Sequence, residues 1–307
     1  MLRSERKKME YNRLSDYLKK RFGTKVYRIS LQTGCSCPNR DGTIGIGGCT
    51  FCSGGGSGEF ASPLLPIREQ IEIAKKQIDQ KFPKGILPKD RKYIAYYQSF
   101  TNTYGETEAL LELFRETILQ PEVAVLSIAT RPDCISDAML SGLSELNKIK
   151  PVWIELGLQT IHEKTAERIH RGFRLNCFEE TYQRLKSEGL EVIVHIILGL
   201  PKETKKEILQ TAAYLGNLQP GIDGIKIQLL HILKGTQLEE EYQKDPFPIL
   251  SLEKYCELVT DCLKLIPRET VIHRITGDGD KKLLVEPLWS GNKKVVLNTL
   301  NRYIREH

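Results

Sequence analysis

Six short runs of apolar, largely β-branched or aromatic residues recur along the chain, and helical patterns separate them. The runs cover residues 26–31, 93–98, 123–129, 152–159, 192–200 and 225–232. Between them, apolar residues recur at helical spacing, as at Ile67, Ile71, Ala74 and Ile78, and again at Leu110, Leu111, Phe114 and Ile118. Strands that alternate with helices form right-handed βαβ units and a parallel sheet.

We therefore predict an α/β fold: a partial (β/α)6 TIM-type barrel of parallel strands with helical N- and C-terminal extensions, because a full eightfold barrel needs about 250 residues. The predicted parts are a basic helical extension over residues 1–25, the barrel over residues 26–236 and a C-terminal extension over residues 237–307. Ser136 and Ser251 are predicted helix starts, Gly189 is a predicted helix stop, and Glu203 or Thr204 is expected to cap the helix after the fifth strand.

Basic residues gather at the two ends of the chain. The 307 residues carry a formal net charge of +6. Residues 1–28 hold ten Lys or Arg against three acidic residues, and the last 27 residues hold six against two. Basic ends of this kind suit a phosphate-binding surface. Solvated terminal helices would carry the same charge, so composition leaves both interpretations open.

No secretory signal or membrane span is predicted. The N-terminus lacks an apolar signal region. The most apolar stretch, residues 192–200, is far shorter than the roughly 20 residues that cross a bilayer. We therefore expect a cytoplasmic protein with no membrane partner, in which the eight cysteines are free thiols and not disulfides.

Three cysteines stand in a glycine-rich loop directly after the first predicted strand. Cys37, Cys49 and Cys52 are separated by eleven and two residues, and the loop has no apolar periodicity. Thiolates at short spacings hold either iron–sulfur clusters or zinc. With Cys35 as a fourth ligand, a structural zinc site fits the spacing equally well. The loop follows the carboxyl end of a strand, where barrel enzymes carry their active sites, and this position favours a functional centre.

Further polar residues lie at the same ends of the later strands. Glu155 and Gln159 share one strand face with Gly157. Taken singly, a buried Glu155 also fits a core ion pair, and His195 fits a structural role. The candidates together are Gln98, Asn102, Glu155, Gln159, Arg171 and His195.

The residues of the cysteine loop and of these strand ends resemble the radical S-adenosylmethionine (SAM) superfamily. The resemblance is to its YhcC/YtqA-like branch, which is related to the radical SAM domain of the Elongator catalytic subunit. It covers the chain from about Tyr11 onward. The motifs that carry it are Cys-Pro-Asn-Arg-Asp-Gly at 37–42, Gly-Gly-Cys-Thr-Phe-Cys at 47–52, Thr-Arg-Pro-Asp-Cys at 130–134, Glu-Leu-Gly-Leu-Gln-Thr at 155–160 and Gly-Leu-Pro at 199–201.

This resemblance implies a cofactor pair and a site for it. Cys37, Cys49 and Cys52 would ligate three irons of a [4Fe–4S] cluster, and the fourth iron would bind SAM, which is cleaved reductively to a 5′-deoxyadenosyl radical. Cys35 would not be a ligand. The implied SAM contacts are Glu155 and Gln159 at the ribose, Arg171 at the carboxylate, and Ile197 and the backbone near Leu230 at the adenine. His195 stands where related enzymes often carry Asp. Gln98 and Asn102 complete the predicted cofactor-binding set, and Phe51 would shield the cluster.

The resemblance also implies a substrate. Its branch is linked to the wobble uridine of tRNA, where a carboxymethylaminomethyl side chain would be processed to an aminomethyl type. The expected partners are tRNA and a small electron-donor protein such as flavodoxin or ferredoxin. Two other interpretations stay open at this point: a radical SAM enzyme acting on a small anionic metabolite, and a zinc-stapled nucleic-acid-binding protein without catalytic activity.

Overall fold

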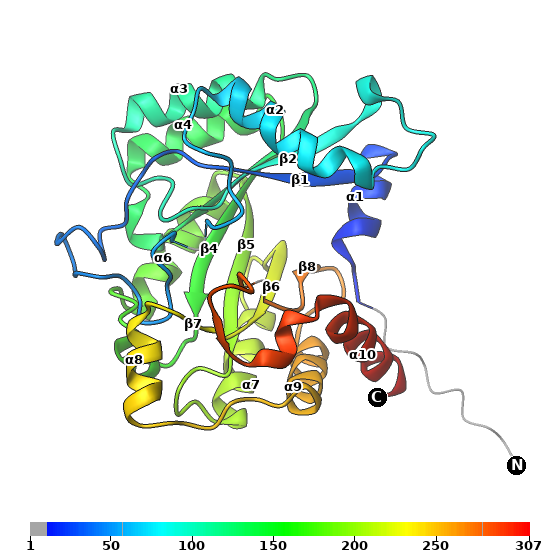
Figure 1. Ribbon diagram of the computed structural model, residues 1–307. Coiled ribbons are helices and arrows are strands. Elements are labelled where there is room, and N and C mark those ends of the chain that lie inside the picture. Colours follow the sequence, from blue (N-terminus) through cyan, green and yellow to red (C-terminus); the bar gives the residue numbers. More distant parts are fainter. Residues whose placement is uncertain (1–10, 57, 278) are drawn as a thin grey trace, which may run out of the picture.

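Seven parallel strands form the central sheet of the computed structural model, which describes residues 11–56, 58–277 and 279–307 (Figure 1). The strand order is β1-β2-β3-β4-β5-β6-β8, and each neighbouring pair is parallel. The bounds are β1 Val26–Leu31, β2 Lys92–Tyr97, β3 Val123–Thr130, β4 Val152–Gln159, β5 Glu191–Leu198, β6 Gly224–Leu229 and β8 Val271–Arg274. A small antiparallel pair joins β7 Ile232–Leu233 to β9 Leu284–Glu286.

Most of the helices connect successive strands, while α1 precedes β1 and α10 follows β9. Their bounds are α1 Leu14–Phe22, α2 Ile67–Ile78, α3 Thr107–Ile118, α4 Asp137–Asn147, α5 Glu163–Arg168, α6 Leu175–Ser187, α7 Lys205–Gly216, α8 Gln237–Lys244, α9 Leu252–Leu265 and α10 Lys293–Glu306. Within the described ranges, 3₁₀ turns lie at Asp79–Lys81, Pro88–Asp90, Pro132–Cys134 and Leu288–Gly291. None of the helices in the described parts of the chain has the length and apolar character that crossing a membrane requires.

The predicted fold class and all six predicted strands are confirmed, but the strand count was one short. β8 pairs in parallel with β6 and extends the partial barrel beyond six strands. It has four residues, and two of them are His273 and Arg274, so no apolar run marks it in the sequence. The part of the predicted basic extension that covers residues 1–10 lies outside the described residues.

Local signals place the helices as predicted. The Ser136 hydroxyl accepts a hydrogen bond from the Met139 amide at 3.2 Å and caps α4. Thr204, and not Glu203, caps α7, where it forms a capping box with Glu207. Gly189 has a φ of 71° just after α6, a conformation that glycine adopts without strain and that ends the helix.

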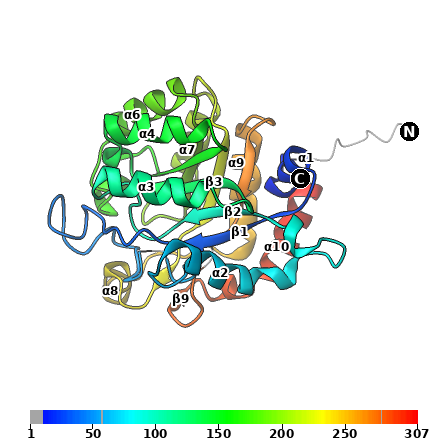
Figure 2. The same cartoon turned by 90° about the horizontal axis from the view of Figure 1, so that it is seen from above.

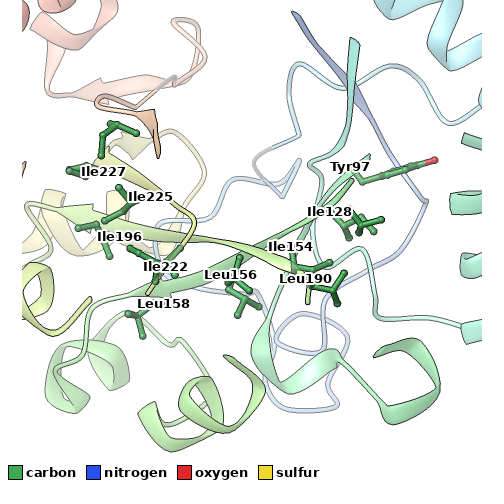
Figure 3. Close-up of a cluster of buried hydrophobic side chains, with 14 of the residues drawn as sticks. Tyr97, Ile128, Ile154, Leu156, Leu158, Leu190, Ile196, Ile222, Ile225 and Ile227 are labelled. Carbon is green, nitrogen blue, oxygen red and sulfur yellow. The ribbon is translucent and has the colours of Figure 1, made fainter. Parts of the chain in front are cut away.

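The main core lies between one face of the sheet and helices such as α3, α4, α6 and α7, which lie together on that side as seen from above (Figure 2). It is made of β-strand side chains such as Ile128, Ile154, Leu156, Ile196 and Ile225, which are fully or almost fully buried (Figure 3). Alternate residues of the same strands face the other way, into the barrel. There Leu18 of α1 packs with Ile94, Val125 and Trp153 in a second, smaller apolar cluster.

Candidate functional site

A cavity of about 190 Å³ is lined by the inward-facing residues of the strands and by the loop that follows β1. The thiols of Cys37, Cys49 and Cys52 all line it. The backbone amide of Cys52 donates to the Cys49 carbonyl at 2.9 Å, and this turn holds two of the thiols close together. The Thr50 amide donates to the Ile169 carbonyl at 3.1 Å, which anchors the loop beside α5. Residues distant in the sequence therefore meet around one cavity.

The thiols stand in an environment that suits a bound metal cluster. Burial, followed by the neighbouring Cys52 and Cys37, raises the pKa of Cys49 to about 12. A thiolate at this position needs positive charge nearby, and metal binding supplies it because metal ligands are deprotonated thiolates. Among the described residues, no three donor side chains are grouped tightly enough to share one metal ion. The three thiols instead surround one cavity, and this arrangement fits a cluster that takes one thiolate per iron.

Cys35 occupies a different place. It does not line the cavity, and its side chain packs against the main core, where a Cβ added at Gly105 would stand 3.3 Å from its sulfur. Burial raises the pKa of this thiol. The prediction that Cys35 is not a ligand thus agrees with its placement and stays a prediction for measurement.

Gln159 ends β4 with its side chain on the cavity wall. The strand register shifts between Gly157 and Gln159, and Gln159 has a φ of 64°, which is rare for a residue other than glycine. Its Oε1 atom is buried and has no hydrogen-bond partner among the described residues. A strand bulge changes the direction in which a side chain points, and a buried acceptor without a hydrogen-bond partner can receive one from a ligand. The two features together are typical of a ligand contact. This orphaned oxygen fits the predicted ribose contact.

Glu155 lies deeper, in the middle of β4, and its carboxylate is fully buried. It accepts hydrogen bonds from Ser127 Oγ at 2.7 Å and from His195 Nε2 at 2.8 Å. It also pairs with Lys226 Nζ and, at 3.4 Å, with an Arg28 nitrogen. Despite burial, these basic neighbours hold the pKa of Glu155 well below its usual range. The core ion pair that the sequence left open is therefore present, and the carboxylate already has four donors before any cofactor binds.

His195 is neutral in this setting. Burial, and next the positive charge of Lys226, lower its pKa to about 4. Since a carboxylate can only accept, Nε2 carries the hydrogen that goes to Glu155, and Nδ1 keeps its lone pair. The ring lines the cavity.

Two arginines flank the cysteine end of the cavity. Arg171 is almost fully buried, and it donates to the carbonyls of Leu158 at 3.1 Å and Thr160 at 2.6 Å. Arg131 donates to both oxygens of Asp133, at 2.9 and 2.7 Å. Both guanidiniums lie close enough to interact electrostatically with Cys49. The sequence motif contains Arg131, but nothing in the sequence gave it a place in the site.

The other predicted contacts divide into two groups. Gln98, Ile197 and Phe51 line the cavity. Asn102 does not, because its buried amide donates to the carbonyls of Tyr97 at 3.1 Å and Ala129 at 2.9 Å and joins the ends of β2 and β3. Leu230 lines a neighbouring hollow that shares Ile197 and Gln98 with the main cavity.

The structure also brings in residues that sequence reasoning missed. Lys226 and Gln228 point into the cavity from β6, and Arg274 does so from β8. Tyr96, from β2, is uncharged, and Lys226 Nζ lies over its ring, 4.3 Å from the ring centre. The available signal was Lys226 itself, the one charged residue in a strand that is otherwise uncharged and mostly apolar, because such a charge ordinarily needs a buried partner.

Comparisons with known proteins were made once this geometry was defined. The sequence profile of the Radical SAM superfamily matches residues 31–215, and that of the Radical_SAM C-terminal domain matches residues 222–306. The uncharacterized protein YtqA of Bacillus subtilis is 44% identical over 293 residues, which cover 95% of this chain and 88% of YtqA. YhcC of Escherichia coli K12 is 36% identical over 291 residues, which cover 94% of this chain and 91% of YhcC. The solved structure of an N-terminally truncated archaeal Elp3 from Methanocaldococcus infernus aligns with a TM-score of 0.64 at 18% identity, over 90% of this chain and 63% of that one, and so supports the fold.

Proposed function

Because the chain belongs to the radical S-adenosylmethionine superfamily, we propose that it is a tRNA-modifying enzyme that acts on the side chain of the wobble uridine. The cofactors of this superfamily, a [4Fe–4S] cluster and SAM, are those of this enzyme. When bound, they supply hydrogen-atom abstraction that begins with reductive cleavage of SAM, while the protein supplies orientation and exclusion of water.

The residues around the cavity divide these tasks. Cys37, Cys49 and Cys52 would each hold one iron and leave the fourth open to SAM. Gln159 would accept a hydrogen bond through its open Oε1 atom. Phe51 and Ile197, which line the cavity, would keep water from the reacting atoms.

The observation that supports an RNA substrate is the meeting of the two basic chain ends. Arg13, Arg302 and Arg305 line a groove of about 440 Å³ with Asn298, Thr299 and Asn301, and we call this set the terminal groove. Tyr11 and Arg13 donate to Asn301 Oδ1, each at 3.2 Å, which fixes the N-terminal segment to α10. Both views show α1 beside α10 (Figures 1 and 2). Among the residues that the structure describes, no acidic side chain lines this groove, so it suits phosphates.

The net conversion removes the carboxymethyl group from the nitrogen of a carboxymethylaminomethyl side chain. The carbon–nitrogen bond breaks, and the aminomethyl side chain keeps its nitrogen. The two-carbon fragment leaves as glyoxylate, with its aldehyde oxygen from water. One SAM would be used per conversion: its products, methionine and 5′-deoxyadenosine, would carry the two electrons and one hydrogen, and a proton would be released. The electron that starts each reductive cleavage of SAM would come from a small donor protein such as flavodoxin or ferredoxin. The reaction would take place in the cytoplasm.

An anaerobic assay tests the proposal. The reconstituted protein is given SAM, a reductant and tRNA purified from a strain that lacks its gene, and the nucleosides are profiled by mass spectrometry. We expect carboxymethylaminomethyluridine to fall and aminomethyluridine to rise, with 5′-deoxyadenosine and glyoxylate in matching amounts. Unchanged wobble nucleosides, both in this assay and in the deletion strain, would refute a tRNA substrate while leaving the cofactors in place.

A further inference from the structure

The sulfur of Cys49 accepts a hydrogen bond from a side chain of its own loop. Asn39 lies ten residues earlier, and its Nδ2 atom donates to Cys49 Sγ at 3.6 Å. The same nitrogen donates to the carbonyl of His170, in the segment that follows α5. A side-chain amide nitrogen carries two hydrogens, so these two acceptors use both of them. The contact with His170 also fixes which end of the amide is the nitrogen, because an amide oxygen cannot donate to a carbonyl.

The Asn39 side chain is closely packed in this position. It is almost fully buried, and the backbone carbonyl of Asn39 accepts from the Gly48 amide at 2.7 Å. Two glycines lie against its Oδ1 atom. A Cβ atom added at Gly45 would stand 2.7 Å from this oxygen, and one added at Gly172 would stand 3.1 Å from it. A methyl group at Gly45 would therefore push the amide aside, so the loop sequence leaves room for Asn39 in this orientation.

The segment after α5 holds Asn39 from the other side. His170, whose carbonyl accepts from Asn39, has a φ of 53°, which is rare for a residue other than glycine. Backbone strain of this kind costs free energy and is concentrated at functional sites. The next carbonyl, that of Arg171, accepts from Arg131 Nη1 at 2.8 Å. Two consecutive carbonyls thus position two side chains that act on Cys49.

Asn39 and Arg131 act on this cysteine in different ways. Arg131 is near enough for its charge to reach Cys49, but its guanidinium is bound to both oxygens of Asp133, whose negative charge offsets it. Asn39 is neutral and contacts the sulfur directly. The Asn39 hydrogen bond is therefore the contact whose strength depends on how much negative charge the sulfur carries.

That charge changes when the cofactor of this superfamily, a [4Fe–4S] cluster, is reduced. One electron passes from the reductant to the cluster and no bond is broken, so the cysteine sulfurs become more negative. Hydrogen bonds to a charged acceptor are roughly twice as strong as those to a neutral one. Hydrogen bonds to the sulfurs are accordingly among the features that set the reduction potential of iron–sulfur clusters.

We infer that Asn39 raises the reduction potential of the cluster through its hydrogen bond to the sulfur of Cys49. Asn39 is a positioning residue, since it acts on the cluster through Cys49 and not by contact with SAM or substrate. The inference rests on the proposed role of Cys49 as an iron ligand, but it does not depend on whether the substrate is tRNA. Cys49→Ala tests the ligand role separately, because it should lose iron and sulfide.

An anaerobic redox titration, followed by the EPR signal of the reduced cluster, tests the inference. Asn39→Leu keeps the size of the side chain and removes both hydrogens. We expect full iron content and an equilibrium constant for one-electron reduction that is about tenfold smaller, a shift of about 59 mV to lower potential. Asn176→Leu, at an exposed asparagine of α6, is the matched control and should keep the wild-type potential.

The sign of the shift separates this role from a structural one. A loop that only loosened would admit water, and water stabilises the added negative charge and moves the potential upward. Loss of the hydrogen bond moves it downward. An unchanged or higher potential in iron-loaded Asn39→Leu would therefore overturn the inference.

A second variant displaces the amide without removing it. Gly45→Ala places a methyl group against Asn39 Oδ1, so we expect its potential to fall as well. Gly54→Ala is its control in the same loop, since an added Cβ atom there meets no described atom within 4 Å. If Asn39→Leu does not assemble a cluster, the comparison of Gly45→Ala with Gly54→Ala decides by the same sign.

The unmodified protein provides an independent readout. Wild type labelled with ¹⁵N in its asparagine side chains should show a ¹⁵N coupling to the reduced cluster in electron–nuclear double resonance. Absence of this coupling would overturn the inference. A full cluster in Cys49→Ala would overturn it too, by removing Cys49 from the ligands, and would leave the choice of tRNA as substrate untouched.

Discussion

At the scale of single residues, Gln159 offers a direct test of cofactor binding. Its buried Oε1 atom has no partner among the described residues, so a ligand that donates to it gains a hydrogen bond without breaking one. We expect Gln159→Ala to weaken SAM binding about tenfold, as judged by equilibrium dialysis of the reconstituted protein. Gln237→Ala, at an exposed residue of α8, serves as the control. Unchanged affinity would mean that the open oxygen faces a water and not the cofactor.

The cysteines make a second prediction at this scale. Cys37 lines the cavity, whereas Cys35 packs against the core beside Gly105. We therefore expect Cys35→Ala to retain the iron and sulfide of the wild type, and Cys37→Ala to lose most of both. Iron and sulfide assays after anaerobic reconstitution provide the measurement. Equal losses in the two variants would show that Cys35 is also a ligand and would revive a four-thiolate site.

His195 predicts a pH effect with a definite sign. Its pKa is about 4 in the folded protein and near 6.5 when unfolded. Between these values the unfolded chain binds more protons, so the histidine's contribution to stability is complete above pH 6.5 and is lost as the pH falls toward 4. The thermal midpoint of the wild type should therefore fall more than that of His195→Gln between pH 7 and pH 5. Glu203, whose raised pKa of about 7 gives the opposite slope, is present in both proteins and cancels.

At the scale of elements, the sequence predicted what periodicity encodes. Six strands have enough consecutive apolar residues to be recognised, and their order in the sheet follows from right-handed crossovers. β8 has four residues with a histidine and an arginine in its second half, so it becomes a strand only because β6 offers a free edge. Asn102 shows the converse: a polar residue after a strand looked like a ligand contact, but it satisfies backbone carbonyls instead.

The buried ion pairs around Glu155 could not be predicted for a related reason. The alternation along β4 placed Glu155 and Gln159 on one face, but it could not show how far each lies from the strand end or which cation meets it. Lys226 reaches Glu155 from a strand that is 71 positions away in the sequence. Such pairs depend on strand register, which single-sequence patterns do not contain.

Tyr255 supplies a prediction about the added strand. This fully buried residue of α9 donates from its hydroxyl to the Ile275 carbonyl at 3.1 Å, just beyond β8. Tyr255→Phe leaves that carbonyl without its partner, at a cost of about 1 kcal/mol. We expect amide hydrogen exchange in residues 271–275 to become about fivefold faster. Tyr214→Phe, which removes a hydroxyl bound to exposed Glu179, should leave these amides unchanged.

At the scale of the whole molecule, the fold presents two surfaces, the cavity and the terminal groove. The terminal groove brings together basic residues that lie near opposite ends of the sequence. The cavity takes residues from the cysteine loop and from β2, β3, β4, β5, β6 and β8. The terminal groove lies where the chain ends meet, against α10. A tRNA is large enough to contact both. In this arrangement the groove would contribute affinity without sequence information, and the cavity would select the modified base.

If the terminal groove binds phosphates, removing its arginines should lower the affinity for tRNA and the dependence of that affinity on salt. Binding at the cavity should not change. Arg302→Gln with Arg305→Gln removes two guanidiniums that form no ion pair within the described residues. If both contact phosphates, the slope of log affinity against log salt should become shallower by about 1.5, and tRNA binding should weaken without a change in SAM affinity. The matched control replaces Lys244 and Arg268, two exposed basic residues elsewhere on the surface. Filter binding across a salt series gives both slopes. Each phosphate contact that is removed releases fewer counterions and makes the slope of log affinity against log salt shallower. Equal slopes for the groove variant and the control would therefore place the RNA on another face.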